Sequence, residues 1–206
     1  MSRIESYYND FYRDLSIIDE AANHFNKIES LLPYLNGEET FLDIGCGHGG
    51  VCSELINKGF NVSGIEINDE AFDSLKSKGF KTYHRDITKP LNINYKFDII
   101  LILDVLEHLF DPLHLLNEAK NITKPNGYII VTIPLYFDII DRLKILFTGS
   151  IISMDNLCYG KDIYLKFRSY NYDHIRFFRP KDIYEIGDNL DLVVDKIEFT
   201  SATFMG

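Results

Sequence analysis

Apolar residues follow two different spacings along this chain. Between residues 20 and 35 they recur every three or four positions, from Ala21 and Phe25 to Leu35, which predicts a helix ending at Asn36-Gly37. Further on, short apolar runs alternate with helix-spaced segments. The runs, together with the return of the same strand–helix unit, predict strands over 41–44, 62–66, 81–84, 97–103 and 128–133. The segments between them predict helices around 51–56, 70–78 and 112–122. The run 97–103 is almost wholly apolar, so we expect a central strand covered on both faces of a sheet.

This alternation predicts an α/β fold with a doubly wound, mostly parallel sheet and helices on both of its faces. Residues 136–182 differ, because they hold ten aromatic residues and a net charge of +2 in a chain of −10. We expect a helix near 138–147, irregular chain up to Phe178, a helix from about Pro180 and a last strand over 192–199. The prediction is a single domain, residues 1–206, with an N-terminal helical cap (1–36) and an inserted segment (136–182).

Composition and charge narrow the classes of partner. The chain has 206 residues, of which 46% are apolar and 25% charged, as in ordinary globular proteins. Asp and Glu (31) outnumber Lys and Arg (21), which disfavours binding to nucleic acid or to an anionic membrane. The three cysteines lack C-x-x-C spacing, which indicates a reducing compartment. No apolar stretch approaches ~18 residues, and the N-terminus carries acids and tyrosines, so we expect a soluble, cytoplasmic protein.

Glycines cluster directly after the first predicted strand. Gly45-x-Gly47-x-x-Gly50 satisfies the dinucleotide fingerprint, and Gly45-x-Gly47-x-Gly49 satisfies the shorter loop of S-adenosylmethionine-binding proteins equally well. Asp43 favours the second ligand. Its carboxylate, two residues before the first glycine, would repel a diphosphate by roughly 1–4 kcal/mol and attract a sulfonium or an ammonium.

Polar residues follow the next three strands as well. Glu66 ends the second strand, where a carboxylate accepts ribose hydroxyls in both cofactor classes. Asp86 and Ile87 follow the third strand, where an acid can accept from an adenine amino group and an aliphatic side chain can pack on the ring. The fourth strand runs into Asp104-Val105-Leu106-Glu107-His108. Because the carboxyl ends of parallel strands share one edge, these residues are expected to line one crevice.

In their order and spacing, these motifs resemble those of class I S-adenosylmethionine-dependent methyltransferases. The similar segments are Leu42–Gly49, Glu66, Arg85-Asp86-Ile87, Phe97–His108 and Lys124–Tyr128, over roughly residues 38–134. The resemblance implies a Rossmann-like fold, S-adenosyl-L-methionine as cofactor and S-adenosyl-L-homocysteine as product. It implies cofactor contacts at Asp43, Gly45, Cys46, Gly47, Gly49, Glu66, Ile67, Asp86, Ile87, Leu103, Asp104 and Val105.

The resemblance has one departure at the end of the sheet. The family usually adds an antiparallel seventh strand, and only seven residues follow Phe199. We therefore expect that strand to be missing, to be supplied by residues 136–182, or to lie outside this sequence.

Candidates for chemistry at the methyl acceptor lie outside the cofactor motifs. His174 is a candidate general base, since histidine titrates near neutral pH, and the alternative is a structural or substrate-orienting role. His108 is the second catalytic candidate, against a role in orienting the cofactor or starting a helix. The residues expected to bind the acceptor are Tyr8, Tyr12, Tyr136 and Arg176. Cys46 is interpreted as a small packing residue rather than a nucleophile.

The sequence thus predicts methyl transfer to an oxygen, nitrogen or carbon atom of a small molecule. An NAD-dependent oxidoreductase and a non-catalytic donor-binding protein of the same fold are the alternatives. The absence of an Asn-Pro-Pro-Tyr-type tetrad after the fourth strand argues against DNA amino-methylation. Asp104, Glu107, His108 and His114 are similar to a metal-binding array of some quinone-pathway O-methyltransferases, but no metal is predicted here.

Overall fold

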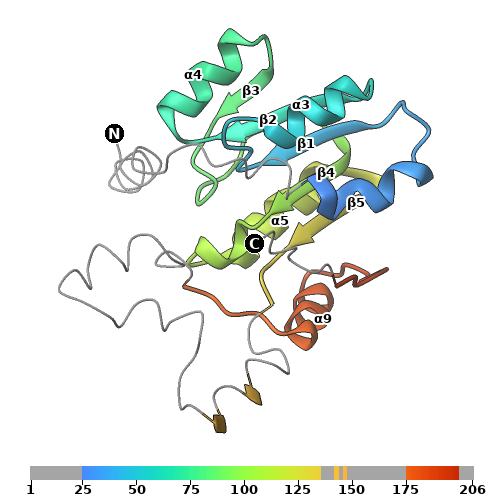
Figure 1. Cartoon of the computed structure of the whole chain (residues 1–206), viewed down its shortest axis with the longest axis vertical. Helices are drawn as coiled ribbons and strands as arrows, with labels where there is room; N and C mark the ends of the chain where they lie inside the picture. The colour runs from blue at the N-terminus through green and yellow to red at the C-terminus, as the bar shows by residue number, and fades with distance from the viewer. Residues whose placement is uncertain (1–24, 136–141, 144–145, 148–174, 200–206) are drawn as a thin grey trace, which may run out of the picture. The chain divides into compact units, whose positions relative to one another are not determined.

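The computed structural model describes residues 25–135, 142–143, 146–147 and 175–199 (Figure 1). Its elements in chain order are η1 (Glu29–Tyr34), β1 (Thr40–Ile44), α3 (Gly50–Asn57), β2 (Asn61–Glu66), α4 (Asp69–Ser77), β3 (Lys81–His84), β4 (Phe97–Leu103), η2 (Leu106–His108), α5 (Pro112–Ile122), β5 (Thr123–Thr132) and α9 (Pro180–Asn189). The chain divides into two compact units. The first holds the described residues up to Val105, together with Leu113–Thr132 and 198–199, and the second holds Leu106–Pro112 and the described residues from Ile133 to Ile197.

Five parallel strands of the first unit form one sheet in the order β3-β2-β1-β4-β5. The predicted α/β fold is therefore confirmed, and β4 is an interior strand between β1 and β5, while β1 holds the middle position. The chain builds outward from β1 to β3 and then returns to the other side of β1 for β4. Loops that leave neighbouring strands in opposite directions open a crevice at the carboxyl edge of the sheet. The point where the strand order reverses, called the topological switch point, lies between β1 and β4.

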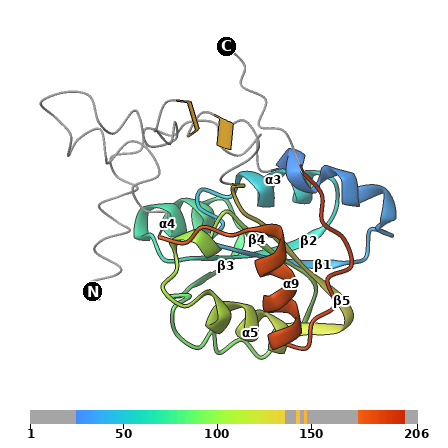
Figure 2. The same cartoon turned by 90° about the horizontal axis from the view of Figure 1, so that it is seen from below.

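Helices cover both faces of this sheet (Figure 2). α3 and α4 lie on one face and α5 on the other, as the right-handed connections of parallel strands require. The core on the α3 face consists of Phe25, Ile28, Phe41, Val51, Cys52, Leu55, Val62, Ile99, Leu101 and Leu103. α5 buries Leu115, Leu116, Ala119 and Ile122. Two covered faces explain why the strand runs are apolar rather than alternating.

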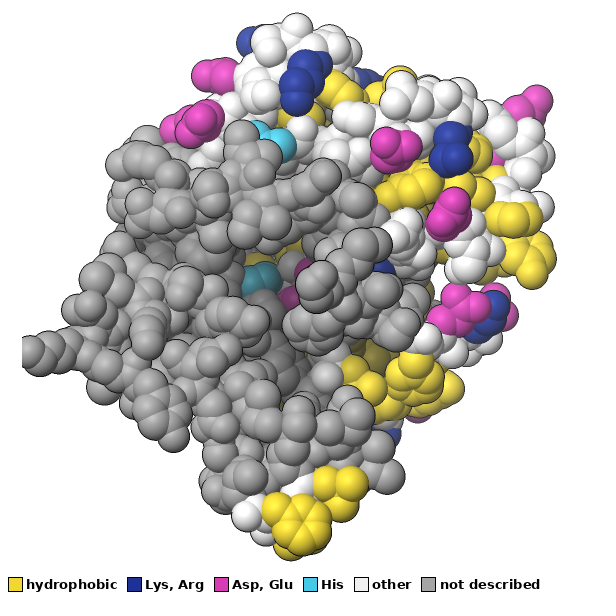
Figure 3. Space-filling view, in the orientation of Figure 1, with side chains coloured by type: hydrophobic (Ala, Val, Ile, Leu, Met, Phe, Trp, Pro, Cys, Tyr) yellow, Lys and Arg dark blue, Asp and Glu magenta, His cyan; other side chains and the backbone are white. Residues whose placement is uncertain are grey.

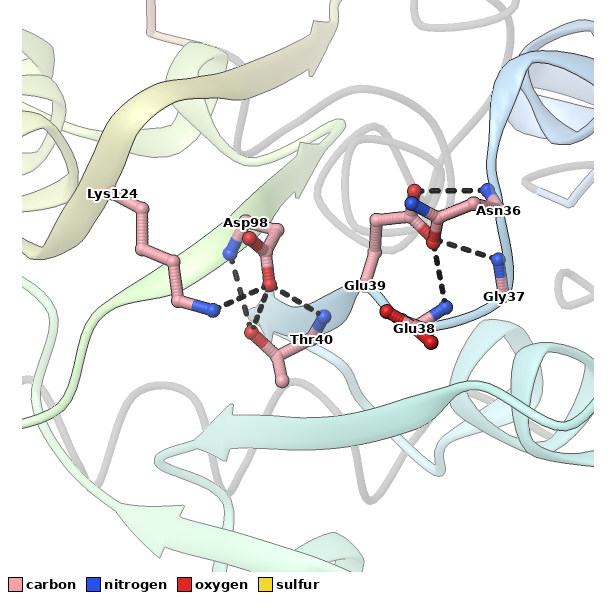
Figure 4. A network of polar contacts seen from close by, with 7 residues as sticks. All are labelled: Asn36, Gly37, Glu38, Glu39, Thr40, Asp98 and Lys124. Carbon is pink, nitrogen blue, oxygen red and sulfur yellow. Dashed lines mark hydrogen bonds and ion pairs between the residues drawn. The ribbon is translucent and has the colours of Figure 1, made fainter.

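A polar network holds the amino ends of three strands, at the edge opposite the glycine turn (Figure 4). Asp98 Oδ2 accepts hydrogen bonds from the Thr40 amide (2.9 Å), the Thr40 hydroxyl (2.7 Å) and Lys124 Nζ (2.8 Å). Burial raises the pKa of Asp98, but the bonds from Lys124 and Thr40 outweigh burial and lower this pKa to about 2. One carboxylate therefore ties β1, β4 and β5 together. Beside it, Glu39 accepts from the amides of Asn36 and Gly37 in the turn that precedes β1.

Two helical segments differ from the prediction at single residues. The segment predicted as one helix over 20–35 is α-helical at 25–28 and a 3-10 helix at Glu29–Tyr34, and its first residues lie outside the described ones. Pro33 explains the change, because its ring and missing N–H are incompatible with the interior of an α-helix. The helix predicted around 51–56 is α3, in which Val51 and Leu55 are buried, whereas Ile56 is 40% exposed because one further residue turns it away from the sheet.

The fifth strand begins earlier than predicted, and the last predicted strand is wrong. Phe97 pairs with Thr123 and Ile99 with Tyr128, so the intervening Pro125-Asn126-Gly127 forms a bulge inside β5. Residues 192–199 make no strand pairing. Their branched apolar residues are typical of strands, but the Leu192 amide donates back to the Gly187 carbonyl of α9 (2.9 Å), and Val193 is 92% exposed.

The second unit contains the helix that was expected to start around Pro180. α9 begins there with proline at its first position, and Asp182 Oδ2 accepts from the Arg179 amide at 2.8 Å. Residues 142–143 and 146–147 are helical, within the helix predicted near 138–147. The rest of the segment 136–174 lies outside the described residues. The single-domain boundaries remain a prediction.

Candidate cofactor site

The glycine turn joins β1 to α3 at the switch point of the sheet. Gly45, Gly47 and Gly49 have positive φ angles of 78°, 51° and 79°, a backbone region that other residues rarely adopt. A Cβ added to Gly45 would lie 2.9 Å from Val105 Cγ2, and one on Gly49 would lie 2.2 Å from Leu75 Cδ2. At Gly47 such an atom would meet nothing within 4 Å. Gly45 and Gly49 thus allow close packing, whereas Gly47 borders open space that a ligand can use.

Glu66 fastens this turn to the end of β2. Its Oε2 accepts from the Gly47 amide (2.8 Å), and its Oε1 accepts from the amides of Ile67 and Asn68 (both 2.7 Å). Burial raises the pKa of Glu66, and the three backbone amides oppose that rise without cancelling it. Glu66 is only 3% exposed. Sequence reasoning expected a ribose-binding acid here, and the geometry adds a second task, which is to fix the turn and the start of the β2–α4 loop.

Asp43 lies buried below the same turn, at the carboxyl end of β1. Burial raises its pKa to about 7; the Cys52 thiol, which donates to Oδ2 at 3.4 Å, opposes the rise, and the nearby Glu66 adds to it. The residue is 3% exposed. The negative charge that the sequence argument assumed for Asp43 therefore depends on pH, since this carboxyl is about half protonated near neutral pH. A cation above the turn would favour its ionised form.

Cys46 and Cys52 pack between the turn and β2. A Cβ on Gly64 would lie 2.5 Å from Cys46 Sγ and 3.8 Å from Cys52 Sγ, so glycine at position 64 makes room for both thiols. The hydrogen bond from Cys52 lowers the pKa of Cys46, but burial and the neighbouring carboxyls outweigh it, so this pKa is raised. The pKa of Cys52 is raised by its hydrogen bond to Cys46 and by burial. Protonated, enclosed thiols agree with the interpretation of Cys46 as a packing residue. The contact of Cys52 with Asp43 had no signal in the sequence.

At the end of β3, Asp86 and Ile87 follow the strand as predicted. Asp86 Oδ1 accepts from the Thr88 amide (3.0 Å) and hydroxyl (2.6 Å), and Oδ2 pairs with Lys89 Nζ (2.8 Å). Burial raises the pKa of Asp86, but the hydrogen bonds from Lys89 and Thr88 outweigh burial, so this pKa is lowered overall. The ionised carboxylate stabilises its own turn. Its expected contact with adenine remains a prediction.

The end of β4 carries a second polar network, built on Asp104. Asp104 has a positive φ of 51°, and its amide donates to the carbonyl (3.0 Å) and hydroxyl (3.1 Å) oxygens of Thr132. The Thr132 hydroxyl in turn donates to Asp104 Oδ1 (2.9 Å), and Lys27 pairs with Oδ2. The neighbours Leu103 and Val105 are buried, and Val105 packs against Gly45. Sequence reasoning missed Lys27, because a lysine one position before a buried Ile28 carries no motif.

The structure brings together the cofactor residues of three strand ends but describes only part of the predicted acceptor site. His174, Tyr8, Tyr12 and Tyr136 lie outside the described residues. His108 is partly buried in η2, four positions after Asp104 in the sequence. Arg176 donates from Nε to the Leu109 carbonyl (3.4 Å) and from Nη2 to the Phe110 carbonyl, contacts that link two segments of the second unit. Its expected role at the acceptor remains a prediction.

Surface features within the described residues give no sign of a second kind of site. Basic and acidic side chains are interspersed on the described part of the face in Figure 3. Across the described ranges, no group of three or more His, Cys, Asp or Glu side chains is arranged to hold a metal ion. None of the helices in those ranges combines the length and apolar character that a membrane span needs.

The fold, the glycine turn at its switch point and the acids at four strand ends define a Rossmann-like nucleoside-binding protein. Comparison with known proteins makes the class specific. A family described as "Methyltransferase domain" matches residues 18–197. The chain therefore belongs to this family, the class I S-adenosylmethionine-dependent methyltransferases, whose cofactor is S-adenosylmethionine.

Curated relatives carry methyltransferase names, and solved structures share the fold. A "Ubiquinone biosynthesis O-methyltransferase" of Shewanella pealeana is 26% identical over 73% of this chain and 62% of its own length. The protein of that name from Rickettsia bellii is 25% identical over 88% of this chain and 70% of its own length. An S-adenosylmethionine-dependent methyltransferase from Archaeoglobus fulgidus shares the fold, with a TM-score of 0.57 and 19% identity over 92% of this chain and 74% of that one. A Bacillus halodurans chain does so with a TM-score of 0.59 and 15% identity, over 82% and 68%.

Proposed function

We propose that this protein transfers the methyl group of S-adenosylmethionine to an oxygen atom of a small molecule. The observation that carries the proposal is the open, left-handed turn at Gly47, with the carboxyls of Asp43 and Glu66 directly below it. A cationic nucleoside gains from those carboxyls, whereas the diphosphate of NAD would add negative charge to them. The family match and the relatives named as O-methyltransferases support both the reaction and oxygen as the acceptor atom.

The tasks of this chain follow from where its groups lie. When bound, the donor supplies an already activated methyl group on a sulfonium. The turn at Gly47 would contact the nucleoside, and Glu66 would contact the ribose. Asp86 and Ile87 would contact the adenine, and the segment Leu103–Val105 would contact the methionyl part. Rigid positioning of donor and acceptor is then the main source of rate acceleration. The buried Glu66 contacts and the close packing of Val105 on Gly45 support such rigidity.

The acceptor side of the proposal rests on sequence and relatives. A hydroxyl acceptor needs a base, and His108 and His174 are the candidates for it. The net charge of +2 over residues 136–182 favours an acidic acceptor, with Tyr8, Tyr12, Tyr136 and Arg176 as candidate contacts. Because the relatives are named for ubiquinone biosynthesis, hydroxylated aromatic compounds are the first acceptors to test. We place the activity in the cytoplasm, without nucleic acid or metal.

Calorimetry followed by a transfer assay tests the proposal. Purified protein is titrated with S-adenosylmethionine and, separately, with NAD. It is then incubated with donor and a panel of phenols and catechols, with release of S-adenosylhomocysteine as the readout. We expect donor binding, no NAD binding, and product release with at least one acidic phenol or catechol. Binding of NAD in place of the donor would overturn the proposal, and donor binding without turnover on any acceptor would support a non-catalytic protein.

A further inference from the structure

His84 is a side chain beside the cofactor residues whose contacts no motif of the sequence explains. It ends β3, and it is paired in register with Glu66, which ends β2. Residues paired across neighbouring parallel strands point to the same face of the sheet, because side chains alternate along both strands. The imidazole of His84 and the carboxyl of Glu66 thus reach the β2–α4 loop from adjacent strands.

The His84 ring contacts both this loop and α4. Its Nε2 lies 2.8 Å from the carbonyl oxygen of Ile67. Because a carbonyl oxygen only accepts hydrogen bonds, Nε2 carries the hydrogen and the imidazole donates it. The same nitrogen lies 3.3 Å from Asp69 Oδ1 in the first turn of α4. The ring also stacks on Phe72, with 4.7 Å between the ring centres and 24° between the planes. These contacts hold the ring with its N–H directed at Ile67.

Ile67 is fixed by hydrogen bonds of both of its backbone groups. Its amide donates to Glu66 Oε1 at 2.7 Å, and its carbonyl accepts from His84. The next residue, Asn68, donates its amide to the same Glu66 oxygen and caps α4 by accepting from the Ala71 amide at 2.8 Å. Together, the bonds to Glu66 and from His84 determine the direction in which the Ile67 side chain points.

The proposed position of the donor leads across this loop. Its ribose is placed at Glu66 on β2, and its adenine is placed at Asp86 and Ile87, after β3. The Arg85 amide donates to the Glu66 carbonyl at 3.2 Å, so the chain that leaves β3 is tied to the end of β2. A nucleoside that spans these two strand ends passes the loop at Ile67, which the resemblance to the family also assigns to the cofactor.

Building on the proposed function, we propose that His84 is a positioning residue for the nucleoside of the donor. Its N–H holds the Ile67 carbonyl, and the Ile67 side chain in turn packs against the nucleoside. His84 acts through Ile67 rather than by a contact of its own with the donor. A small displacement of a group that contacts a ligand weakens binding. Loss of the N–H should therefore weaken every ligand that carries the adenosine, with or without the methionyl part.

Calorimetry on the full chain tests this role with S-adenosylmethionine, S-adenosylhomocysteine and 5′-methylthioadenosine. His84→Phe removes the N–H and keeps a ring that can stack on Phe72. It should weaken all three ligands about tenfold, the scale of one hydrogen bond. His84→Gln, whose side-chain amide can donate in place of Nε2, should restore most of the affinity. Because the His84 side chain is 39% exposed, both variants should fold, which thermal denaturation checks. His84→Leu, which also lacks a donor, replaces the phenylalanine variant if that one does not fold.

A double-mutant cycle with Ile67 separates positioning from a general structural role. Ile67→Ala should itself weaken the three ligands, because it removes the packing on the nucleoside. In the Ile67→Ala background, His84→Phe should cause a further loss of less than about twofold, since the side chain that His84 positions is absent. A structural effect that does not pass through Ile67 would appear in full in both backgrounds.

Two control variants address the other contacts of β3 and of the His84 ring. Asp69→Asn removes the carboxylate near His84 Nε2 and keeps the size of the side chain. Lys81→Met changes the first residue of β3, whose Nζ lies 5.1 Å from the Tyr95 ring centre. Neither variant should change any of the three affinities. A tenfold loss in Asp69→Asn would show that His84 acts through α4 instead of Ile67, and it would overturn the inference.

Three further outcomes would contradict the inference. If His84→Phe binds the three ligands as wild-type protein does, or if His84→Gln restores nothing, the N–H has no role in donor binding while the proposed function stands. If the loss in His84→Phe is undiminished in the Ile67→Ala background, His84 does not act through Ile67. If wild-type protein binds none of the three ligands, the proposed function itself is wrong, and the inference with it.

Discussion

Protonation of single side chains governs the chemistry below the glycine turn. Asp43 and Glu66 are both buried, and burial raises the pKa of each above its ordinary value, that of Asp43 to about 7. The Asp43 carboxyl is therefore only partly ionised near neutral pH in the ligand-free protein. A bound cation lowers the pKa again, so binding and ionisation are coupled.

Donor affinity should therefore depend on pH. Below pH 7, Asp43 is mostly protonated and must lose its proton to stabilise a cation, whereas above pH 7 it is already ionised. We expect the affinity for S-adenosylmethionine to rise between pH 6 and 8, with a slope of at most about tenfold per pH unit for one proton. Calorimetry at pH 6, 7 and 8 measures this slope.

The Asp43→Asn variant is the control for that slope. It keeps the size of the side chain and removes the titration, so its affinity should be flat over the same range. An equally steep slope in the variant would show that another group titrates.

Glu66 should matter for stability as well as for binding. Glu66→Ala leaves three backbone amides, those of Gly47, Ile67 and Asn68, without their acceptor. We expect a loss of about 2–3 kcal/mol in the free energy of unfolding and of about 1–3 kcal/mol in donor binding. Urea denaturation and calorimetry measure the two effects. Glu70→Ala, an exposed acid of α4, is the matched control, and an unchanged dissociation constant for Glu66→Ala would count against the ribose assignment.

At the scale of elements, the β1–α3 turn combines two kinds of glycine. An added methyl group at Gly49 would collide with Leu75 of α4, whereas at Gly47 it would enter open space. Both positions have positive φ, so alanine is strained at either. Only the first substitution also forces two helices apart.

Alanine substitutions should separate packing from binding in this turn. Gly49→Ala should destabilise the fold by about 2–4 kcal/mol through the clash with Leu75, on the scale of overpacking plus backbone strain. Gly47→Ala should cost about 1 kcal/mol of stability and weaken donor binding strongly. Gly37→Ala, at φ 89° with nothing within 4 Å, should show the same small loss of stability with unchanged binding. Thermal denaturation measures the losses of stability, and calorimetry measures the donor affinities. Equal donor affinities for Gly37→Ala and Gly47→Ala would show that Gly47 does not belong to the cofactor site.

The network at the opposite edge of the sheet predicts a pH dependence of stability alone. The pKa of Asp98 is lowered to about 2, below its unfolded value of 3.8, so its contribution is complete above about pH 4 and is lost as the pH falls through 2. Asp98→Asn should reduce the free energy of unfolding by about 1–2 kcal/mol at pH 7 and have little effect near pH 2. Urea midpoints at both pH values test this. Donor affinity at pH 7 should be unchanged, since the network lies at the amino ends of the strands.

The elements that sequence reasoning located well are those with a local cause. The strand at 97–103 has its predicted bounds because it is a nearly continuous apolar run. The strand at 81–84 also has its predicted bounds, although its residues are mostly polar, because the repeating strand–helix unit places it. The errors came from context. Residues 192–199 are rich in branched apolar residues but form no strand, and Pro33 changes a helix whose apolar spacing is regular.

The same distinction applies to the candidate site. Asp43, Glu66 and the glycines were predictable, because their positions at strand ends follow from the repeating strand–helix unit. The pairing of Lys27 with Asp104 and of Cys52 with Asp43 was not, because each joins segments whose proximity only the folded chain creates.

At the scale of the whole molecule, donor binding should be visible as a gain in stability. A ligand that binds only the folded state at a hundred times its dissociation constant adds about 2.7 kcal/mol. For a chain of this size that corresponds to a rise in Tm of about 5–10 °C. We expect this rise with S-adenosylmethionine and with S-adenosylhomocysteine, and none with NAD, in a thermal denaturation assay. A rise with NAD alone would favour the oxidoreductase hypothesis.

The position of the sheet in the sequence has a consequence for biosynthesis. All five paired strands lie between Thr40 and Thr132, and the crossover helices that cover them lie in the same stretch. On a ribosome, the five described strands have all been made before the residues that follow Thr132 are translated. The nascent polypeptide can therefore assemble its nucleoside-binding half first, and the later residues emerge beside a surface that already has its final form.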